Sequence, residues 1–253
     1  MTRVAVSGAG GRMGRLVMAA VAAAADLELV AAFDPAHAGE AISDVVVASD
    51  PTVVGEADVV VEFTAPTVVM ANLAAWRGFG VHAVVGTSGF DSARLDALRE
   101  QWGTGPPNCL VVPNFSIGAV LMMKFAEMAA PHFAASEIIE LHHDAKADAP
   151  SGTALTTAAR IGAAGGPQRR QVESEELLPG ARGADAGPRV HSVRLPGLLA
   201  HQEVLFGSAG ETLAIRHDTS DRVSFMPGVL LAIRSVASLD EPVIVGLEGL
   251  LGI

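Results

Sequence analysis

Short β-branched segments alternate with helical patterns through the first 113 residues, and this alternation limits the possible folds more than any other feature of the chain. The predicted strands cover residues 3–7, 27–33, 59–63, 81–85 and 110–112. The predicted helices between them cover residues 12–25, 68–79 and 92–102. Strands that alternate with helices are joined by right-handed crossovers. The pattern therefore predicts an α/β fold with a Rossmann-like, doubly wound parallel sheet.

The second half of the chain has a different pattern. Helical segments at 119–130 and 153–164 flank a predicted strand at 137–142. Further strands are predicted at 190–195, 201–206 and 212–217, with a hairpin-like turn at 207–211, before a final helix at 227–238 and a short apolar tail. These elements predict a second α+β domain with an open mixed sheet. The segment 165–187, which includes Glu173, Glu175 and Glu176, is rich in Gly, Pro and charge, and it predicts a mobile connection or an excursion at the sheet edge.

Composition narrows the class of protein. Half of the 253 residues are hydrophobic and only 4% are aromatic, which suits a parallel sheet covered by alanine-rich helices. The net charge of -11 disfavours binding to nucleic acid or to a membrane surface. Cys109 is the single cysteine, so the chain has no internal disulfide, and its apolar neighbours favour a buried structural thiol. The N-terminus does not resemble a signal peptide and no uninterrupted apolar run is long enough to span a bilayer, so we expect a cytoplasmic protein.

A glycine-rich turn follows the first predicted strand and precedes the first predicted helix. Glycine lets backbone N–H groups approach a phosphate closely, and the start of a helix adds unpaired donors and the positive end of its dipole. The turn therefore predicts binding of a dinucleotide pyrophosphate, although Met13 departs from strict G-x-G-x-x-G spacing and an ordinary turn remains the alternative. The residues involved are Gly8, Ala9, Gly10, Gly11, Arg12, Met13 and Gly14.

Asp34 ends the second predicted strand about 20 residues after this turn, where an acidic side chain accepts hydrogen bonds from the adenosine ribose hydroxyls. The next residues, Pro35 and Ala36, offer no cation for a 2′-phosphate. We therefore expect NADH to be preferred over NADPH. Arg12 is close enough in sequence to the turn to reach a phosphate, so use of both cofactors stays open, and a surface turn aspartate is the alternative for Asp34.

Two further strand ends have small or amide side chains suited to a nicotinamide ring. Ligands of doubly wound sheets bind beyond the carboxyl ends of the strands, which is where both segments lie. An ordinary strand-to-helix turn explains each segment equally well when it is taken alone. The residues are Gly86, Thr87 and Ser88 in one segment and Val112, Pro113, Asn114 and Phe115 in the other.

The densest group of reactive side chains follows the strand at 137–142. It consists of His142, His143, Asp144, Lys146 and Asp148. Adjacent residues of a strand point to opposite faces, so the two histidines do not easily converge on one ion, and Lys146 repels a cation. We therefore expect no metal site here.

Proton transfer suits these residues better, because an imidazole titrates near pH 6.5 and exchanges protons at neutral pH. Lys146 can donate a proton or bind a carboxylate. Ser151, Gly152 and Thr153 open a predicted helix, whose free backbone N–H groups and hydroxyls bind an anion. The cluster predicts a carboxylated substrate. The alternative is that the histidines are solvated and that Ser151 only caps the helix.

These residues resemble the 4-hydroxy-tetrahydrodipicolinate reductase family, also called dihydrodipicolinate reductase, of bacterial diaminopimelate and lysine synthesis. The motif His-His-x-x-Lys-x-Asp-Ala-Pro-Ser-Gly-Thr at 142–153 is highly specific to that family. The resemblance covers essentially the whole chain and includes the segments 8–14, 86–89, 113–115, 140–153 and 197–228.

The resemblance implies a role for each matching residue. It makes His142 a proton donor or acceptor and Lys146 a second proton donor, while His143, Gly152 and Thr153 bind substrate carboxylates. It assigns the cofactor to residues 8–13, Asp34, 86–88 and 112–115. The implied reaction is the NAD(P)H-dependent reduction of a cyclic dicarboxylic acid with loss of its hydroxyl as water. No metal is implied.

The resemblance also implies an assembly and a domain plan. The family forms homotetramers through the sheet of its second domain. Its C-terminal segment packs back on the nucleotide domain, so we expect a discontinuous dinucleotide-binding domain at 1–114 and 218–253 around a substrate-binding and oligomerisation domain at 115–217.

Some positions depart from the commonest family pattern. Ser88 replaces a frequent threonine but keeps the hydroxyl, and Val112 stands where alanine is common. No arginine follows Asp34, which weakens the case for a strong NADPH preference. Two other functions remain open: an amino-acid dehydrogenase, such as an aspartate dehydrogenase, and an NADH-binding sensor without turnover. The pair of His142 and Lys146 argues against the sensor, because a binding module needs no proton donors.

Overall fold

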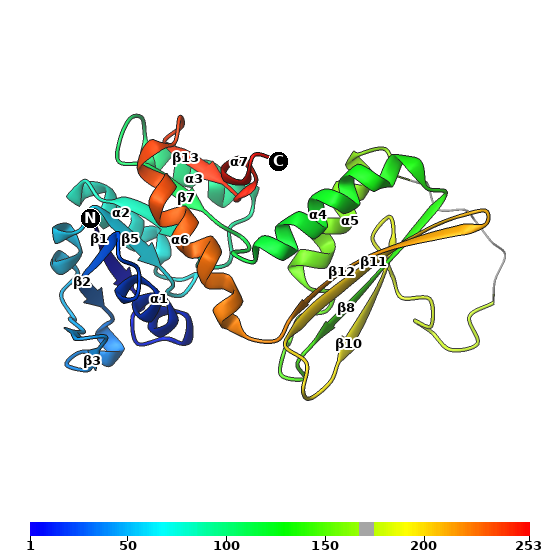
Figure 1. The fold of residues 1–253 in the computed structure, drawn as a ribbon, viewed down its shortest axis with the longest axis horizontal. Helices are drawn as coiled ribbons and strands as arrows, with labels where there is room; N and C mark the ends of the chain where they lie inside the picture. The colour runs from blue at the N-terminus through cyan, green and yellow to red at the C-terminus, as the bar shows by residue number, and fades with distance from the viewer. Residues whose placement is uncertain (167–174) are drawn as a thin grey trace. The chain divides into compact units, whose positions relative to one another are not determined.

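The computed structural model describes residues 1–166 and 175–253, and it divides the chain into two compact units. The first unit comprises Met1–Ile117 and Val223–Ile253, and the second comprises Gly118–Arg222. Figure 1 follows the chain through both. Within the described residues, no helix is both long enough and apolar enough to cross a membrane.

The first unit is built on a parallel sheet of six strands in the order β13-β7-β6-β5-β1-β2. The chain passes from β1 to β2 on one side and then to β5 on the other side, which confirms the predicted doubly wound sheet. Such a reversal places a ligand site beyond the carboxyl ends of the strands around β1. The strands are β1 (Thr2–Ser7), β2 (Leu27–Phe33), β5 (Val59–Glu62), β6 (His82–Val85), β7 (Cys109–Val111) and β13 (Val243–Val245).

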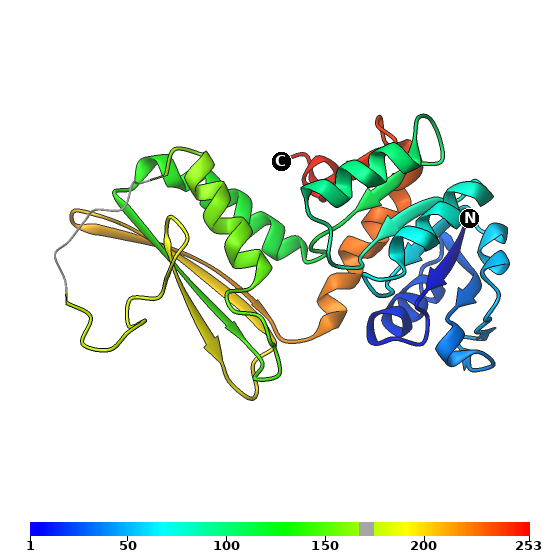
Figure 2. The ribbon, with the colours of Figure 1, turned by 180° about the vertical axis from the view of Figure 1, so that it is seen from behind.

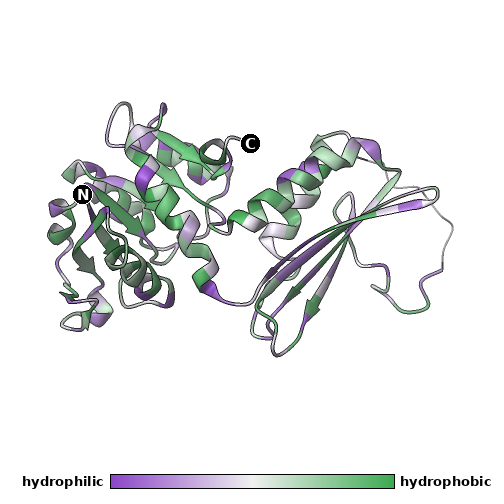
Figure 3. Cartoon of the chain, in the orientation of Figure 1, coloured by the Kyte–Doolittle hydropathy of each residue, from purple (hydrophilic) through white to green (hydrophobic). Residues whose placement is uncertain are grey.

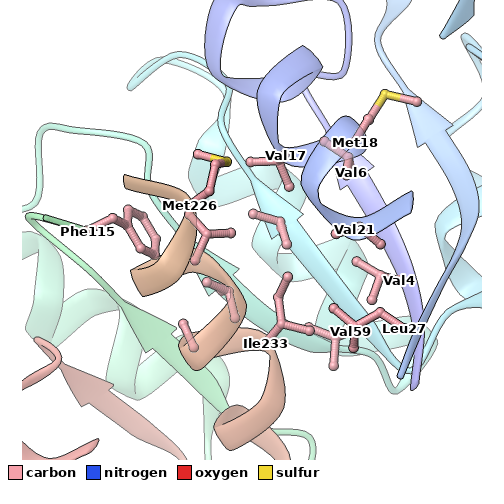
Figure 4. Close-up of a cluster of buried hydrophobic side chains, with 14 of the residues drawn as sticks. Val4, Val6, Val17, Met18, Val21, Leu27, Val59, Phe115, Met226 and Ile233 are labelled. Atoms are coloured by element: carbon pink, nitrogen blue, oxygen red, sulfur yellow. The ribbon is translucent and has the colours of Figure 1, made fainter. Parts of the chain in front are cut away.

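Helices cover both faces of this sheet, because alternate strand residues are apolar on both sides. Val4 and Val6 pack in one cluster with residues of α1 and α6 (Figure 4), and Ala5 packs in the other with residues of α2 and α3. Burial on both faces explains the continuous apolar strands, which Figure 3 shows in hydrophobic colours. The helices of the unit are α1 (Arg12–Ala22), α2 (Val69–Phe79), α3 (Ser92–Trp102), α6 (Met226–Ser235) and α7 (Glu248–Leu251).

Shorter elements complete the first unit. Strands β3 (Ala41–Ile42) and β4 (Val45–Val46) form a small hairpin. The 3₁₀ turns are η1 (Pro35–His37), η2 (Pro51–Glu56), η4 (Arg222–Phe225) and η5 (Val236–Ser238). The predicted helix at 227–238 thus ends earlier as an α-helix, and its last residues form η5.

The apolar tail is an element that the sequence prediction missed. Residues Val243–Val245 form β13, which pairs in parallel with β7 at the sheet edge. The side-chain amide of Asn108 fixes the approach to this strand, because it donates to the backbone oxygens of Val236 (3.0 Å) and Leu239 (3.2 Å). The C-terminal segment therefore belongs to the six-stranded sheet of the first unit.

The second unit contains a five-stranded sheet in the order β12-β11-β8-β10-β9. β8 and β10 run parallel and the other pairs run antiparallel, which confirms an open mixed sheet. Helices α4 and α5 lie on one face of it (Figure 2). The elements are α4 (Ile117–Ala129), η3 (Ala130–His132), β8 (Ala135–His142), α5 (Gly152–Ala163), β9 (Ala184–Asp185), β10 (Arg189–Arg194), β11 (Ala200–Ser208) and β12 (Glu211–Thr219).

The two faces of this second sheet differ. On the face under α4 and α5, Ile138, Val190, Val204 and Phe206 form a buried cluster. The alternate residues of the same strands point to the other face, where half-buried apolar side chains lie in the middle of the sheet. They are Ile139, Leu141, Val193 and Leu205.

The connection predicted at 165–187 is only partly described. Glu173 lies outside the described residues. Glu175 and Glu176 precede the short edge strand β9, which pairs with β10.

Candidate active site

The turn after β1 packs so tightly that two of its glycines have no room for a side chain. Gly8 has φ +79°, and a Cβ there would lie 2.3 Å from the backbone oxygen of Phe63. A Cβ at Gly14 would lie 2.1 Å from the backbone oxygen of Gly8. Among the described residues, no side chain caps the start of α1 at Gly11. The turn therefore has the shape and the helix-end donors that a phosphate requires.

Asp34 is joined directly to this turn. Its Oδ2 accepts hydrogen bonds from the backbone N–H of Gly10 and pairs with Nδ1 of His37, each at 3.0 Å, while Oδ1 accepts from the Ala36 N–H at 3.0 Å. The structure thus brings the predicted ribose-binding residue to the predicted phosphate-binding turn. The sequence prediction missed His37, which packs so closely on Gly10 that a Cβ there would lie 2.1 Å from its ring.

The two further predicted segments meet at the same edge of the sheet. A Cβ at Gly86 would lie 2.1 Å from the ring of Phe63, and that ring lies 5.4 Å from the ring of Phe115. Val112 donates its N–H to the Val85 oxygen at 2.8 Å, which aligns the end of β7 with β6. The ends of β1, β5, β6 and β7 therefore converge around the glycine turn, as a cofactor site of this fold requires.

A buried carboxylate that the sequence prediction missed links two of these strand ends. Glu62 is fully buried at the end of β5 and accepts hydrogen bonds from Trp76 Nε1 (2.9 Å), from Asn72 Nδ2 (3.1 Å) and from the Thr64 hydroxyl. Thr64 in turn donates its N–H to Thr87 Oγ1 at 2.9 Å. The loop after β5 is thus tied to the predicted nicotinamide-binding segment at 86–88. The one feature of the sequence that could have indicated this buried carboxylate is a glutamate at the end of an otherwise apolar strand.

The second group of predicted residues lies at the end of β8 in the second unit. Glu140 and His142 are two residues apart, so they share a face of the strand, and His142 Nδ1 lies 2.5 Å from Glu140 Oε2. Arg194 of β10 forms a bidentate pair with the same carboxylate, with both N···O distances at 2.9 Å. The Ser151 N–H donates to Glu140 Oε1 at 3.2 Å. Sequence reasoning predicted His142 and Ser151 but gave no role to Glu140 or Arg194.

These contacts set the charges of the group. Burial raises the pKa of Glu140, but hydrogen bonds from Arg194, Ser192 and His142 outweigh it and hold that pKa below its ordinary value. Burial lowers the pKa of His142, and the charges of Lys146 and Arg194 lower it further, so that Glu140 only partly offsets the shift. At neutral pH the carboxylate is therefore charged and the imidazole is mainly neutral.

Lys146 lies in the loop that follows β8. Its Nζ donates to both carboxylate oxygens of Asp148, at 2.7 and 2.8 Å, and this pair lowers the pKa of Asp148. Arg194 also donates to the Asp148 backbone oxygen at 2.6 Å. The loop with Lys146 and the strand with His142 are thus held by one guanidinium group.

The loop ends at the start of α5. The Ser151 hydroxyl accepts from the Ala154 N–H at 3.2 Å, so the predicted cap is confirmed and this hydroxyl is engaged within the helix end. Gly152 and Thr153 form the first turn of α5. His143 stands between β8 and this loop, where its backbone oxygen accepts from the Lys146 N–H at 3.1 Å. In the part of the chain that the structure describes, no three His, Cys, Asp or Glu residues come together as a metal site.

Comparison with known proteins decides the family. Residues 2–115 match the family model for the N-terminus of dihydrodipicolinate reductase, and residues 118–251 match the model for its C-terminus. The chain belongs to the dihydrodipicolinate reductase family. A 4-hydroxy-tetrahydrodipicolinate reductase of Cutibacterium acnes is 53% identical over 259 residues, with 100% of both chains covered. These matches confirm the resemblance that the 142–153 motif indicated.

Solved structures agree with this membership. A dipicolinate-bound dihydrodipicolinate reductase of Paenisporosarcina sp. TG-14 is 40% identical, with a TM-score of 0.85, and the alignment covers 98% of this chain and 99% of that one. An aspartate dehydrogenase of Thermotoga maritima is 15% identical with a TM-score of 0.52, covering 94% of this chain and 97% of that one. The second likeness concerns the fold alone, so it gives no support to aspartate dehydrogenase activity.

Proposed function

We propose that this chain reduces 4-hydroxy-tetrahydrodipicolinate to tetrahydrodipicolinate with NADH or NADPH, in the synthesis of diaminopimelate and lysine. The observation that most supports this proposal is the group of His142 and Lys146 beside the start of α5, held by the buried pair of Glu140 and Arg194. This group occurs in a chain whose full length matches the reductase family.

The reaction takes up one hydride and one proton and releases one water, and the bound nicotinamide cofactor supplies the hydride. Hydride addition to an unsaturated carbon leaves negative charge on the conjugated atoms, which a nearby acid must neutralise. We assign this proton to the Lys146 ammonium, and we assign to the mainly neutral His142 the role of proton acceptor or exchange partner. The backbone donors at Gly152 and Thr153, together with His143, bind the substrate carboxylates.

The cofactor is assigned to the carboxyl edge of the first sheet. Backbone groups of residues 8–13 hold the pyrophosphate, Asp34 accepts from the ribose hydroxyls, and residues 86–88 and 112–115 surround the nicotinamide. The fit of this edge rests on Gly8 and Gly14, where a side chain would collide with the backbone of Phe63 or of Gly8 and so prevent the tight turn that a phosphate needs. NADH is the expected preference, because Asp34 is an acceptor that repels a 2′-phosphate.

A coupled assay tests the function. The purified chain should oxidise NADH when the preceding synthase supplies fresh substrate, and it should not reduce NAD⁺ when given aspartate. Normal NADH binding without turnover would identify a sensor instead. Reduction of NAD⁺ by aspartate would identify an aspartate dehydrogenase.

Asp34→Ala tests the ribose assignment. Loss of a charged hydrogen-bond acceptor should weaken NADH binding by roughly 10- to 100-fold, measured as the Kd from quenching of NADH fluorescence, and should weaken NADPH binding much less. Asp50→Ala is a matched control, because Asp50 also precedes a proline and caps a 3₁₀ turn through the Thr52 N–H at 2.9 Å. Equal losses for NADH and NADPH would contradict the assignment.

We propose that the chain assembles as a homotetramer through the open face of the second sheet. Half-buried Ile139, Leu141, Val193 and Leu205 form an apolar centre on this face, with charged residues such as Glu203 and Arg216 beside it. Sedimentation of the purified chain should give a tetramer, and Leu141→Arg should reduce its mass to that of smaller species. A tetramer unaffected by Leu141→Arg would place the interface elsewhere.

A further inference from the structure

Glu140 is a fully buried carboxylate in the middle of the second sheet, under α4 and α5. Burial of a charge is costly unless hydrogen bonds and an opposite charge compensate for it. Glu140 has such partners: two nitrogens of Arg194, Nδ1 of His142 and the Ser151 N–H. Two of the four contacts, those of His142 and Ser151, come from the strand end and loop that the proposed function uses, and the other two come from Arg194 on β10.

The charge of Glu140 determines which nitrogen of His142 holds the hydrogen. An ionised carboxylate only accepts hydrogen bonds, so the nitrogen that contacts it must be the donor. Nδ1 lies 2.5 Å from Glu140 Oε2, and therefore the neutral imidazole has its hydrogen on Nδ1. Nε2 is then the atom that accepts a proton or a hydrogen bond from a ligand.

Arg194 holds this arrangement in place. Its two terminal nitrogens each contact one oxygen of Glu140, which keeps the carboxylate ionised and fixes its plane. The same guanidinium donates to the backbone oxygen of Asp148 at 2.6 Å, next to the pair of Asp148 and Lys146. One residue thus links the orientation of His142 to the position of the loop with Lys146.

We propose that Glu140 is a positioning residue that fixes the Nδ1–H tautomer of His142. In this proposal Arg194 holds Glu140 in place and fixes the position of the Lys146 loop relative to it. This inference rests on the proposed function in one respect, which is that His142 exchanges a proton with the substrate. The tautomer itself is a property of the chain alone.

The same sheet contains two other groups of a carboxylate, an arginine and a histidine, which serve as comparisons. Glu137 pairs with Arg182 and with His191 Nε2 (2.8 Å), and Asp218 pairs with Arg216 and with His201 Nδ1 (2.7 Å). The side chains of the two carboxylates, Glu137 and Asp218, are 32% and 48% exposed, whereas that of Glu140 is 0% exposed. Glu137 lies on the same strand as Glu140 but faces the opposite side of the sheet, so Glu137→Gln is the matched control.

Glu140→Gln should reverse the tautomer. Glutamine has one oxygen and one NH₂ in place of the two oxygens. The Ser151 N–H cannot accept a hydrogen bond, so the amide oxygen takes the place of Oε1, where it accepts from Ser151 and from one Arg194 nitrogen. The NH₂ takes the place of Oε2, where it faces His142 and loses the hydrogen bond from the other Arg194 nitrogen. Nδ1 must then become the acceptor, and the hydrogen moves to Nε2.

Nitrogen-15 NMR of the imidazoles measures this directly in the full chain, and the His142 signals are assigned by comparison with His142→Gln. The wild-type chain should show protonated Nδ1 and unprotonated Nε2, Glu140→Gln should show the reverse, and Glu137→Gln should match the wild type. A wild-type His142 with its hydrogen on Nε2 would overturn the proposal. The wild-type measurement needs neither activity nor a Glu140 variant, so it is independent of the proposed function and of the folding of any variant at Glu140.

Kinetics supply the second arm. Glu140→Gln should lower kcat by roughly 10²–10⁴-fold, as a wrong tautomer does elsewhere, with the Kd for NADH unchanged. The Glu140 charge raises the pKa of His142 and the Arg194 charge lowers it, so losing the carboxylate should move the His142 limb of the pH–rate profile to lower pH. Glu140→Asp should recover part of kcat. Wild-type kcat and pH profile in Glu140→Gln would overturn the positioning role, whereas absence of turnover in the wild type would reject the proposed function alone.

Discussion

Replacing His142 with glutamine is expected to lower kcat by roughly 10²–10⁴-fold while the Kd for NADH stays nearly unchanged. The reason is that glutamine keeps a polar side chain of similar reach but exchanges no proton. His142 also lies in the second unit, at the end of β8, whereas the residues proposed to bind NADH lie in the first. Steady-state rates with fresh substrate and fluorescence titration of NADH measure the two quantities.

His191→Gln is the control for this substitution. His191 is also paired with a glutamate, at 2.8 Å, but it lies on β10 and faces the open side of the sheet. Because this face is the proposed tetramer interface, sedimentation must first show that the variant assembles as the wild type does, and its kcat should then be unchanged. If His142→Gln kept the wild-type kcat, the assignment of proton exchange to His142 would be wrong.

Lys146→Gln should lower kcat by roughly 10²–10³-fold, because the variant loses the ammonium proposed to donate the proton. The chain contains only one other lysine, Lys124, which pairs with Glu127 on α4 at 3.2 Å. Lys124→Gln is therefore a control of identical chemistry and should retain the wild-type kcat. The substrate dependence of the rate separates the possible roles of Lys146. A rise in KM with an unchanged kcat would mean that Lys146 binds a carboxylate only, and it would contradict proton donation.

Much of the fold was predictable because its signals are local. Five of the six strands in the first sheet are short apolar runs that alternate with helical patterns along the chain, and this alternation predicts a parallel sheet with right-handed crossovers. β13 was missed for a physical reason. It has three residues, Val243–Val245, and its structure depends on pairing with β7, more than 130 positions earlier in the chain.

Some residues of the candidate site could likewise be predicted from the sequence, and others could not. His142, Lys146 and Ser151 were predictable because one continuous segment contains all three. Arg194 was not predictable, since it reaches Glu140 only through the parallel pairing of β10 with β8, in which Arg194 stands opposite His142. Glu140 could have been recognised from the sequence, because a glutamate two residues before a histidine on a strand lies on the same face as that histidine.

Transfer of deuterium from NADH to the product is the most direct measurement of the proposed reduction. NADH labelled with deuterium at the transferred position of its nicotinamide is mixed with the purified chain and fresh synthase product, and the reduced product is examined by mass spectrometry. The proposed reduction predicts one deuterium per molecule of tetrahydrodipicolinate with the wild-type chain, and a strongly reduced rate of its appearance with His142→Gln. NADH oxidation without deuterium in the product, or no labelled product from the wild-type chain, would contradict it.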